Sequence, residues 1–153
     1  MAIPKKIRIN REEHYRTHYI GKFDGKRMFM GFVVATLPFL HPADWQNHKR
    51  YYAVLHKFDE DGSHTGTEAW FAGVAAEGED EVSLRAHHKL NEMIAALGKH
   101  RFGNVRVKLF STQVDGQEFG LVKVVREEDG NDEVHLLPND LVFCEPWDGE
   151  YDT

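Results

Sequence analysis

Residues 105–125 read VRVKLFSTQVDGQEFGLVKVV, and this stretch decides the fold class. Apolar and basic side chains alternate over residues 105–109, which is the period of a β-strand with one buried face. The pair Asp115-Gly116 then interrupts the run, and both residues tolerate the positive φ angles of a tight hairpin turn. We therefore predict a hairpin of two strands, 105–112 and 117–125.

The same turn signal recurs along the chain. Asp24-Gly25 and Asp61-Gly62 each separate two segments of strand character, and Asp129-Gly130 precedes two shorter ones. The expected strands at these turns are 18–23, 26–36, 51–58, 64–71, 134–137 and 141–144. Because the connections are short, neighbouring strands should pair antiparallel, giving about eight strands in a meander of hairpins.

One segment has the helical period instead. Apolar residues recur at steps of three and four over residues 81–97, which predicts one main amphipathic α-helix. Asp80 is the expected N-cap, and Gly98 can take the left-handed conformation that ends a helix. A second, shorter helical turn is expected over residues 42–46.

Length and composition agree with a globular fold. The chain has 153 residues, of which 41% are hydrophobic and 29% charged, with a single cysteine, so an internal disulfide framework is excluded. We predict a single α+β domain over residues 1–153. Its core is a twisted antiparallel sheet of about eight strands, with the helix at about 81–97 packed on one face.

Charge is divided unevenly along the chain. Residues 1–50 hold 10 basic and 4 acidic side chains, whereas residues 51–153 hold 9 basic and 21 acidic ones, and the net charge is −6. An acidic chain repels a phosphate backbone, which disfavours nucleic acid as a partner. The basic N-terminal third leaves a weaker affinity for nucleic acid as an alternative. We expect its basic side chains instead to pair with the acidic remainder of the fold or to lie solvated on the surface. These side chains are Lys5, Lys6, Arg8, Arg11 and Arg16.

Targeting and metal-binding signals are weak. The sequence has no apolar run that could cross a bilayer and no signal-peptide pattern at residues 1–6, so we expect a cytoplasmic protein without a membrane partner. Among ten histidines, His14-x3-His18 and His88-x3-Glu92 have workable ligand spacing, but neither pair has a third ligand. We expect no bound metal and no cofactor.

Residues 37–50 connect the expected strands 26–36 and 51–58. This loop is long for a connection between two strands, and long loops tend to be functional. Aromatic and arginine side chains are the usual anchors of binding surfaces. The candidate binding residues are Phe39, His41, Trp45, His48 and Arg50. In the alternative interpretation, Phe39 and Trp45 cap an open end of the sheet core.

Several short motifs carry a family resemblance. They are Leu37-Pro38-Phe39, Tyr52-Ala53-Val54-Leu55-His56, Trp70-Phe71-Ala72-Gly73, Leu137-Pro138-Asn139-Asp140-Leu141 and Pro146-Trp147-Asp148-Gly149. With these motifs the chain resembles a family of small bacterial proteins often labelled formate hydrogenlyase regulatory proteins. The resemblance implies a bacterial cytosolic protein with a regulatory role, and it supplies no active-site residues.

Three functional hypotheses follow from these observations. The first is a non-enzymatic module that binds another protein through residues 37–50; exposed sheet edges leave a homodimer open. The second is an immunity or antitoxin-like protein whose acidic residues cover the basic site of a toxin. The third is a small enzyme, metal-assisted or not, with a site assembled from His41, His48 and His56.

Overall fold

A computed structural model describes residues 3–37, 43–126, 131–139 and 141–153. These residues form three antiparallel sheets and one α-helix. The strands are β1 (Ile7–Ile9), β2 (Tyr19–Phe23), β3 (Arg27–Thr36), β4 (Arg50–Phe58), β5 (His64–Val74), β6 (His100–Phe102), β7 (Val105–Val107), β8 (Phe110–Val114), β9 (Gln117–Val125), β10 (Asp132–Leu137) and β11 (Leu141–Phe143). The sheet orders are β5-β4-β3-β2-β6, β11-β10-β9-β8 and β1-β7.

Three of the predicted Asp-Gly turns are confirmed as hairpin connections. Asp24-Gly25 joins β2 to β3 with φ angles of 49° and 86°, and Asp115-Gly116 joins β8 to β9 with 51° and 80°. Two consecutive positive φ angles give the turn a twist that matches the twist of the flanking strands. Asp61-Gly62 lies in a longer turn between β4 and β5. Asp129-Gly130 lies outside the described residues.

The α+β class is confirmed, but the expectation of one sheet of about eight strands is wrong. The segment 105–112, predicted as one strand, divides at Lys108 and Leu109 into β7 and β8. Strand β7 pairs with β1, whereas β8 pairs with β9. Leu109, expected on the buried face, is 40% exposed because it lies at this division. The chain therefore passes from one sheet to another between β7 and β8, although the strand pattern of the sequence continues through residues 108 and 109.

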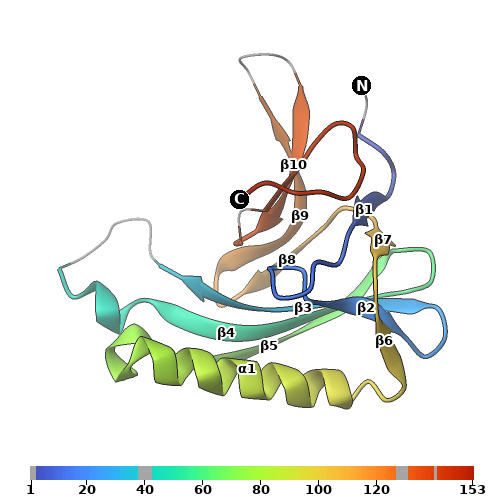
Figure 1. Ribbon diagram of the computed structural model, residues 1–153. Coiled ribbons are helices and arrows are strands. Elements are labelled where there is room, and N and C mark those ends of the chain that lie inside the picture. Colours follow the sequence, from blue (N-terminus) through green and yellow to red (C-terminus); the bar gives the residue numbers. More distant parts are fainter. Residues whose placement is uncertain (1–2, 38–42, 127–130, 140) are drawn as a thin grey trace.

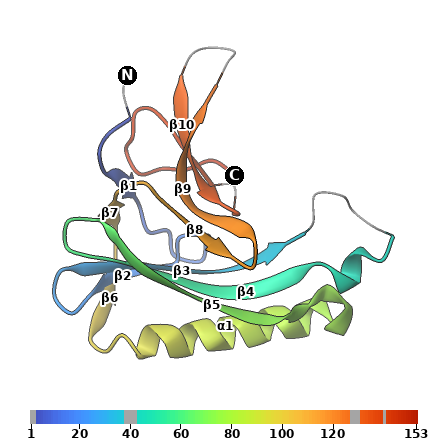
Figure 2. The same cartoon turned by 180° about the vertical axis from the view of Figure 1, so that it is seen from behind.

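The five-stranded sheet is the middle layer of the molecule (Figure 1). Helix α1 (Glu79–Ala95) covers one face, and the four-stranded sheet with the β1–β7 ribbon stands on the other face, as the opposite view also shows (Figure 2). Neighbouring residues of β4 consequently enter two separate cores. Val54 and Phe58 lie in the core between the sheets, whereas Ala53 and Leu55 lie in the core under the helix.

Helix α1 confirms the predicted amphipathic segment with a small shift. It spans Glu79–Ala95 instead of about 81–97, and its buried side chains are Val82, Ala86, Leu90, Met93 and Ile94. Gly98 has a φ of 83°, as expected of a residue that follows a helix end. The predicted N-cap is wrong, because Gly78 holds that position and Asp80 lies in the first turn. The 3₁₀ turn η2 (Ala75–Glu77) comes just before the helix, which therefore begins at Glu79, before the predicted start.

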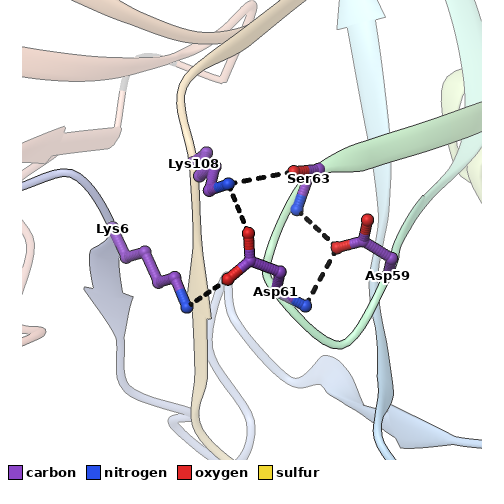
Figure 3. Close-up of polar contacts among 5 residues, drawn as sticks. All are labelled: Lys6, Asp59, Asp61, Ser63 and Lys108. Atoms are coloured by element: carbon purple, nitrogen blue, oxygen red, sulfur yellow. Dashed lines mark hydrogen bonds and ion pairs between the residues drawn. The ribbon is translucent and has the colours of Figure 1, made fainter.

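The turn between β4 and β5 is fixed to the β1–β7 ribbon. Within the turn, Asp59 Oδ1 accepts the backbone N–H groups of Asp61 and Ser63, both at 2.9 Å (Figure 3). The backbone N–H of Lys108 donates to the Gly62 carbonyl at 2.9 Å. Gly62 has a φ of 85°, and a Cβ atom there would lie 2.8 Å from the Arg106 carbonyl oxygen. Only glycine permits this approach.

Alanine at Gly62 should therefore destabilise the fold more than alanine at Gly116. Gly116 has a similar φ of 80°, but a Cβ atom at that position would have no neighbour within 4 Å, so it reports the backbone strain alone. We expect Gly116→Ala to lose about 1 kcal/mol and Gly62→Ala at least about 1 kcal/mol more, measured by urea unfolding. Equal losses would contradict the close contact between this turn and β7.

Candidate functional site

Trp45 lies at the surface, half-buried, at one end of the five-stranded sheet. It begins the short 3₁₀ helix η1 (Trp45–Asn47), which has no buried residue, and it belongs to neither hydrophobic core. The Lys49 ammonium lies 5.7 Å from the centre of its ring. Among the described residues, Trp45 therefore packs on neither core, whereas the alternative interpretation placed it over an open end of the sheet core. Phe39 and His41 lie outside the described residues.

His48 follows η1 and is exposed. Its Nε2 atom lies 3.3 Å from Asp44 Oδ2, one helical turn earlier. This contact orders the segment just before β4 begins at Arg50.

Arg50 is the most firmly positioned of the predicted residues. Its guanidinium lies 4.1 Å from the centre of the Phe71 ring, and its Nε donates to the Tyr52 hydroxyl at 2.7 Å. That hydroxyl donates in turn to Asp115 Oδ2 at 2.7 Å, and Arg50 Nη2 lies 3.4 Å from the same oxygen. We call these four residues, Arg50, Tyr52, Phe71 and Asp115, the Arg50 surface.

Two strands and one hairpin turn build the Arg50 surface. Tyr52 and Phe71 are cross-strand neighbours on β4 and β5, and Asp115 lies at the tip of the β8–β9 hairpin. The hydrogen bond that Arg50 donates to the Tyr52 hydroxyl raises the pKa of Arg50. Burial, and then the hydrogen bond to Asp115, raise the pKa of Tyr52. Arg50 is thus held as a cation over an aromatic ring that is still 41% exposed.

A second polar group lies on the opposite face of the sheet. The Tyr51 hydroxyl donates to Glu79 Oε1 at 2.6 Å, and Lys49 Nζ lies 2.7 Å from the same oxygen. Hydrogen bonds from Lys49 and then from Tyr51 lower the pKa of Glu79. Side chains alternate between the faces of a strand, so β4 separates Lys49 and Tyr51 from Arg50 and Tyr52. The end of the predicted loop and the start of β4 therefore form two separate polar groups, one on each face of the sheet.

The histidines proposed for an enzyme do not converge in the described residues. His56 is fully buried on β4, whereas His48 precedes that strand, and eight residues of extended chain span about 26 Å. Within the described ranges no group of three or more His, Cys, Asp or Glu side chains is arranged to hold a metal ion. Of the three residues in this hypothesis, His41 lies outside the described part of the chain.

His56 forms a different cluster, which the sequence did not indicate. Its Nδ1 and His64 Nε2 each lie 2.7 Å from the Thr67 hydroxyl oxygen, and its ring centre lies 4.8 Å from that of Phe110. Its Nε2 is buried without a hydrogen-bond partner among the described residues. Burial, with a smaller effect from His64, lowers the pKa of His56 to about 3. His56 is therefore a neutral core residue at physiological pH.

Two residues of the Arg50 surface were missed because they come from other parts of the chain. Asp115 was interpreted only as a turn residue, and Phe71 only as part of a strand and of a family motif. Arg50 meets both because of the register Tyr52↔Phe71 and the position of the β8–β9 hairpin. A sequence signal for these contacts exists only once the strand pairing is known.

The basic N-terminal side chains are divided between pairing and the surface, as expected. Of the five, Lys6 alone has an ion pair within the described ranges, with Asp61 at 3.0 Å. Arg8 Nε donates to Asn10 Oδ1, and Arg11 Nε donates to the His18 carbonyl oxygen. Lys5, Arg8 and Arg16 are exposed.

Comparisons with family models, with curated proteins and with solved structures gave no match. The resemblance to formate hydrogenlyase regulatory proteins consequently stays a prediction. No helix in the described part of the chain is long and apolar enough to cross a membrane.

The lowered pKa of His56 predicts that acid destabilises the fold. The unfolded chain binds a proton at His56 below pH 6.5, whereas the folded chain does so only near pH 3. Protonation therefore favours the unfolded chain, and the free energy of unfolding decreases as the pH falls from 6.5 towards 3. Between pH 7 and pH 5 the loss should be about 2 kcal/mol, measured by urea unfolding, and His56→Leu should remove it.

His88→Gln is the matched control, because the His88 side chain is 80% exposed. This variant should keep the pH dependence of the wild type. If His56→Leu and His88→Gln lost stability equally with falling pH, His56 would not be the buried neutral group described above.

Proposed function

We propose that this chain is a non-enzymatic protein-binding module with a regulatory role, and that it contacts its partner through the Arg50 surface. The observation that carries the proposal is the Arg50 guanidinium, fixed 4.1 Å above a ring that is 41% exposed. An arginine stacked on an aromatic side chain is typical of the residues that dominate binding energy in protein interfaces.

Preorganisation supports this role. Tyr52 and Asp115 hold the guanidinium in place, so binding loses little side-chain entropy at Arg50. The hydrogen bonds of Arg50 to these two residues use Nε and Nη2, which leaves Nη1 without a hydrogen-bond partner among the described residues. A partner with a carboxylate beside an apolar side chain would fit this donor and the exposed part of Phe71.

The sheet edge beside Phe71 supports the same proposal. Strand β5, on which Phe71 lies, is an edge strand of 11 residues that pairs only with β4 among the described strands. Strand β5 contains no proline, no aspartate, no lysine and no arginine, and Glu68 is its single glutamate. Such an edge can receive a further strand, from a partner or from a second copy of this chain. The homodimer and the antitoxin-like role remain alternatives that no contact among the described residues favours.

Truncating Phe71 should weaken partner binding. We expect Phe71→Ala to weaken capture of the specific partner from a lysate of the source cell at least tenfold, measured by quantitative mass spectrometry. Leu84→Ala is the matched control, because Leu84 is 71% exposed on the helix, across the sheet from Phe71. A partner retained equally by both variants would overturn the assignment of this surface.

Trp45→Ala tests whether Trp45, in the neighbouring 3₁₀ turn, has a structural role. Since Trp45 lies in neither core, its truncation should change the free energy of unfolding by less than about 1 kcal/mol. Leu90→Ala, in the core under the helix, should lose about 2 to 5 kcal/mol by comparison. If Trp45→Ala destabilised the fold as much as Leu90→Ala, Trp45 would be a structural residue.

A further inference from the structure

A groove beside the β1–β7 ribbon is lined mainly by cationic side chains. It has a volume of about 460 Å³, and Lys6, Arg8, Lys22 and Arg106 line it against a single carboxylate, Glu60. Pockets of this size are typical of sites for small ligands. The concentration of positive charge is unexpected on a chain whose net charge is −6.

The strand register places like charges directly opposite each other. Arg8 faces Arg106 in the β1–β7 ribbon, and Lys22 faces Arg101 between β2 and β6. Opposed side chains on one sheet face have Cβ atoms about 5 Å apart, and like charges there are destabilising. Within the described ranges, Lys22, Arg101 and Arg106 have no ion pair that would relieve this repulsion. An anion in the groove would supply the missing counter-charge.

The chain itself shows how the end of the ribbon holds an anion. Lys6 and Lys108 reach Asp61 from two sides, with Nζ to carboxylate distances of 3.0 Å and 2.5 Å (Figure 3). These two lysines lower the pKa of Asp61 to about 2. Asp61 therefore neutralises Lys6 and Lys108, whereas Arg8 and Arg106 have no such carboxylate among the described residues.

A second, smaller cavity has one lining residue in common with the groove. This cavity has a volume of about 280 Å³, shares Lys22 with the groove, and adds Lys99 and Arg101 to the cationic lining. Asn104 contributes a polar wall to the groove, and its Oδ1 already accepts the backbone N–H of Arg11. The Asn104 amide therefore presents its NH₂ group as a further donor for an anion.

We propose that this groove binds a small ligand that carries two or more phosphate groups. An arginine guanidinium group can bind two phosphate oxygens at once. The opposed pairs Arg8–Arg106 and Lys22–Arg101 therefore offer places for more than one phosphate. The acidic charge of the whole chain disfavours a long nucleic acid, whereas a compact anion meets only the groove. Figures 1 and 2 place the ribbon at the end of the sheet opposite η1, so this site is separate from the Arg50 surface.

Titration with inorganic tripolyphosphate by isothermal calorimetry tests the proposal. At about 0.1 M salt the wild type should bind one equivalent, and Arg106→Gln should weaken binding about tenfold or more. Lys89→Gln removes the same charge from the helix on the far side of the sheet, so it is the matched control and should bind within about twofold of the wild type.

Two outcomes would overturn the proposal. One is no binding of tripolyphosphate by the wild type, and the other is an equal loss of affinity in Arg106→Gln and Lys89→Gln, which would indicate unspecific charge attraction. A single-stranded oligonucleotide should bind more weakly than tripolyphosphate. Tighter binding of the oligonucleotide would indicate a nucleic-acid site instead of a site for a small ligand, and it would also overturn the proposal.

Thermal unfolding supplies a second, independent measurement. Because Arg8 and Arg106 repel each other, Arg106→Gln should unfold at a higher temperature than the wild type at low salt without added anion. Tripolyphosphate should raise the midpoint of the wild type and leave that of the variant nearly unchanged. A variant less stable than the wild type, with an unchanged response to the anion, would show that Arg106 has a structural role only.

Discussion

Strands β3 and β4 are buried on both faces, and this burial determines where the other elements lie. Val54 and Leu55 are adjacent on β4, point to opposite faces, and are both fully buried. A strand that is apolar on both faces must be covered twice, because exposing either face would cost about 25 cal/mol for each Å² of apolar area. Helix α1 supplies one cover, and the four-stranded sheet with the β1–β7 ribbon supplies the other.

The second cover also creates both candidate sites. It requires the chain to leave the middle sheet after β6, pair β7 with β1, and start a new sheet at β8. The β8–β9 hairpin then brings Asp115 to Arg50, and the ribbon carries Arg8 and Arg106 on its outer face. The surface chemistry is thus a consequence of how the inner face is covered.

Local signals in the sequence predicted the elements well, but not their partners. Asp24-Gly25 and Asp115-Gly116 define hairpins because turn geometry depends on two adjacent residues, and the helix follows from the spacing of its own apolar residues. The division at Leu109 was missed because the alternation of apolar and polar residues is the same whichever sheet a strand belongs to. In the Arg50 surface, Arg50 was predicted because residue type and loop length are readable from the sequence. Phe71 was not found, since its contact with Arg50 depends on the register between β4 and β5.

Native-state hydrogen exchange is the most direct test of the central claim. If burial on both faces of β3 and β4 holds the structure together, the backbone amides of Val54 and Leu55 should exchange only through global unfolding. Their opening free energy would then equal the free energy of unfolding from urea denaturation, and amides in α1 and β9 would open at equal or lower free energy. Exchange of the β4 amides at a lower free energy than those of α1 and β9 would contradict the account.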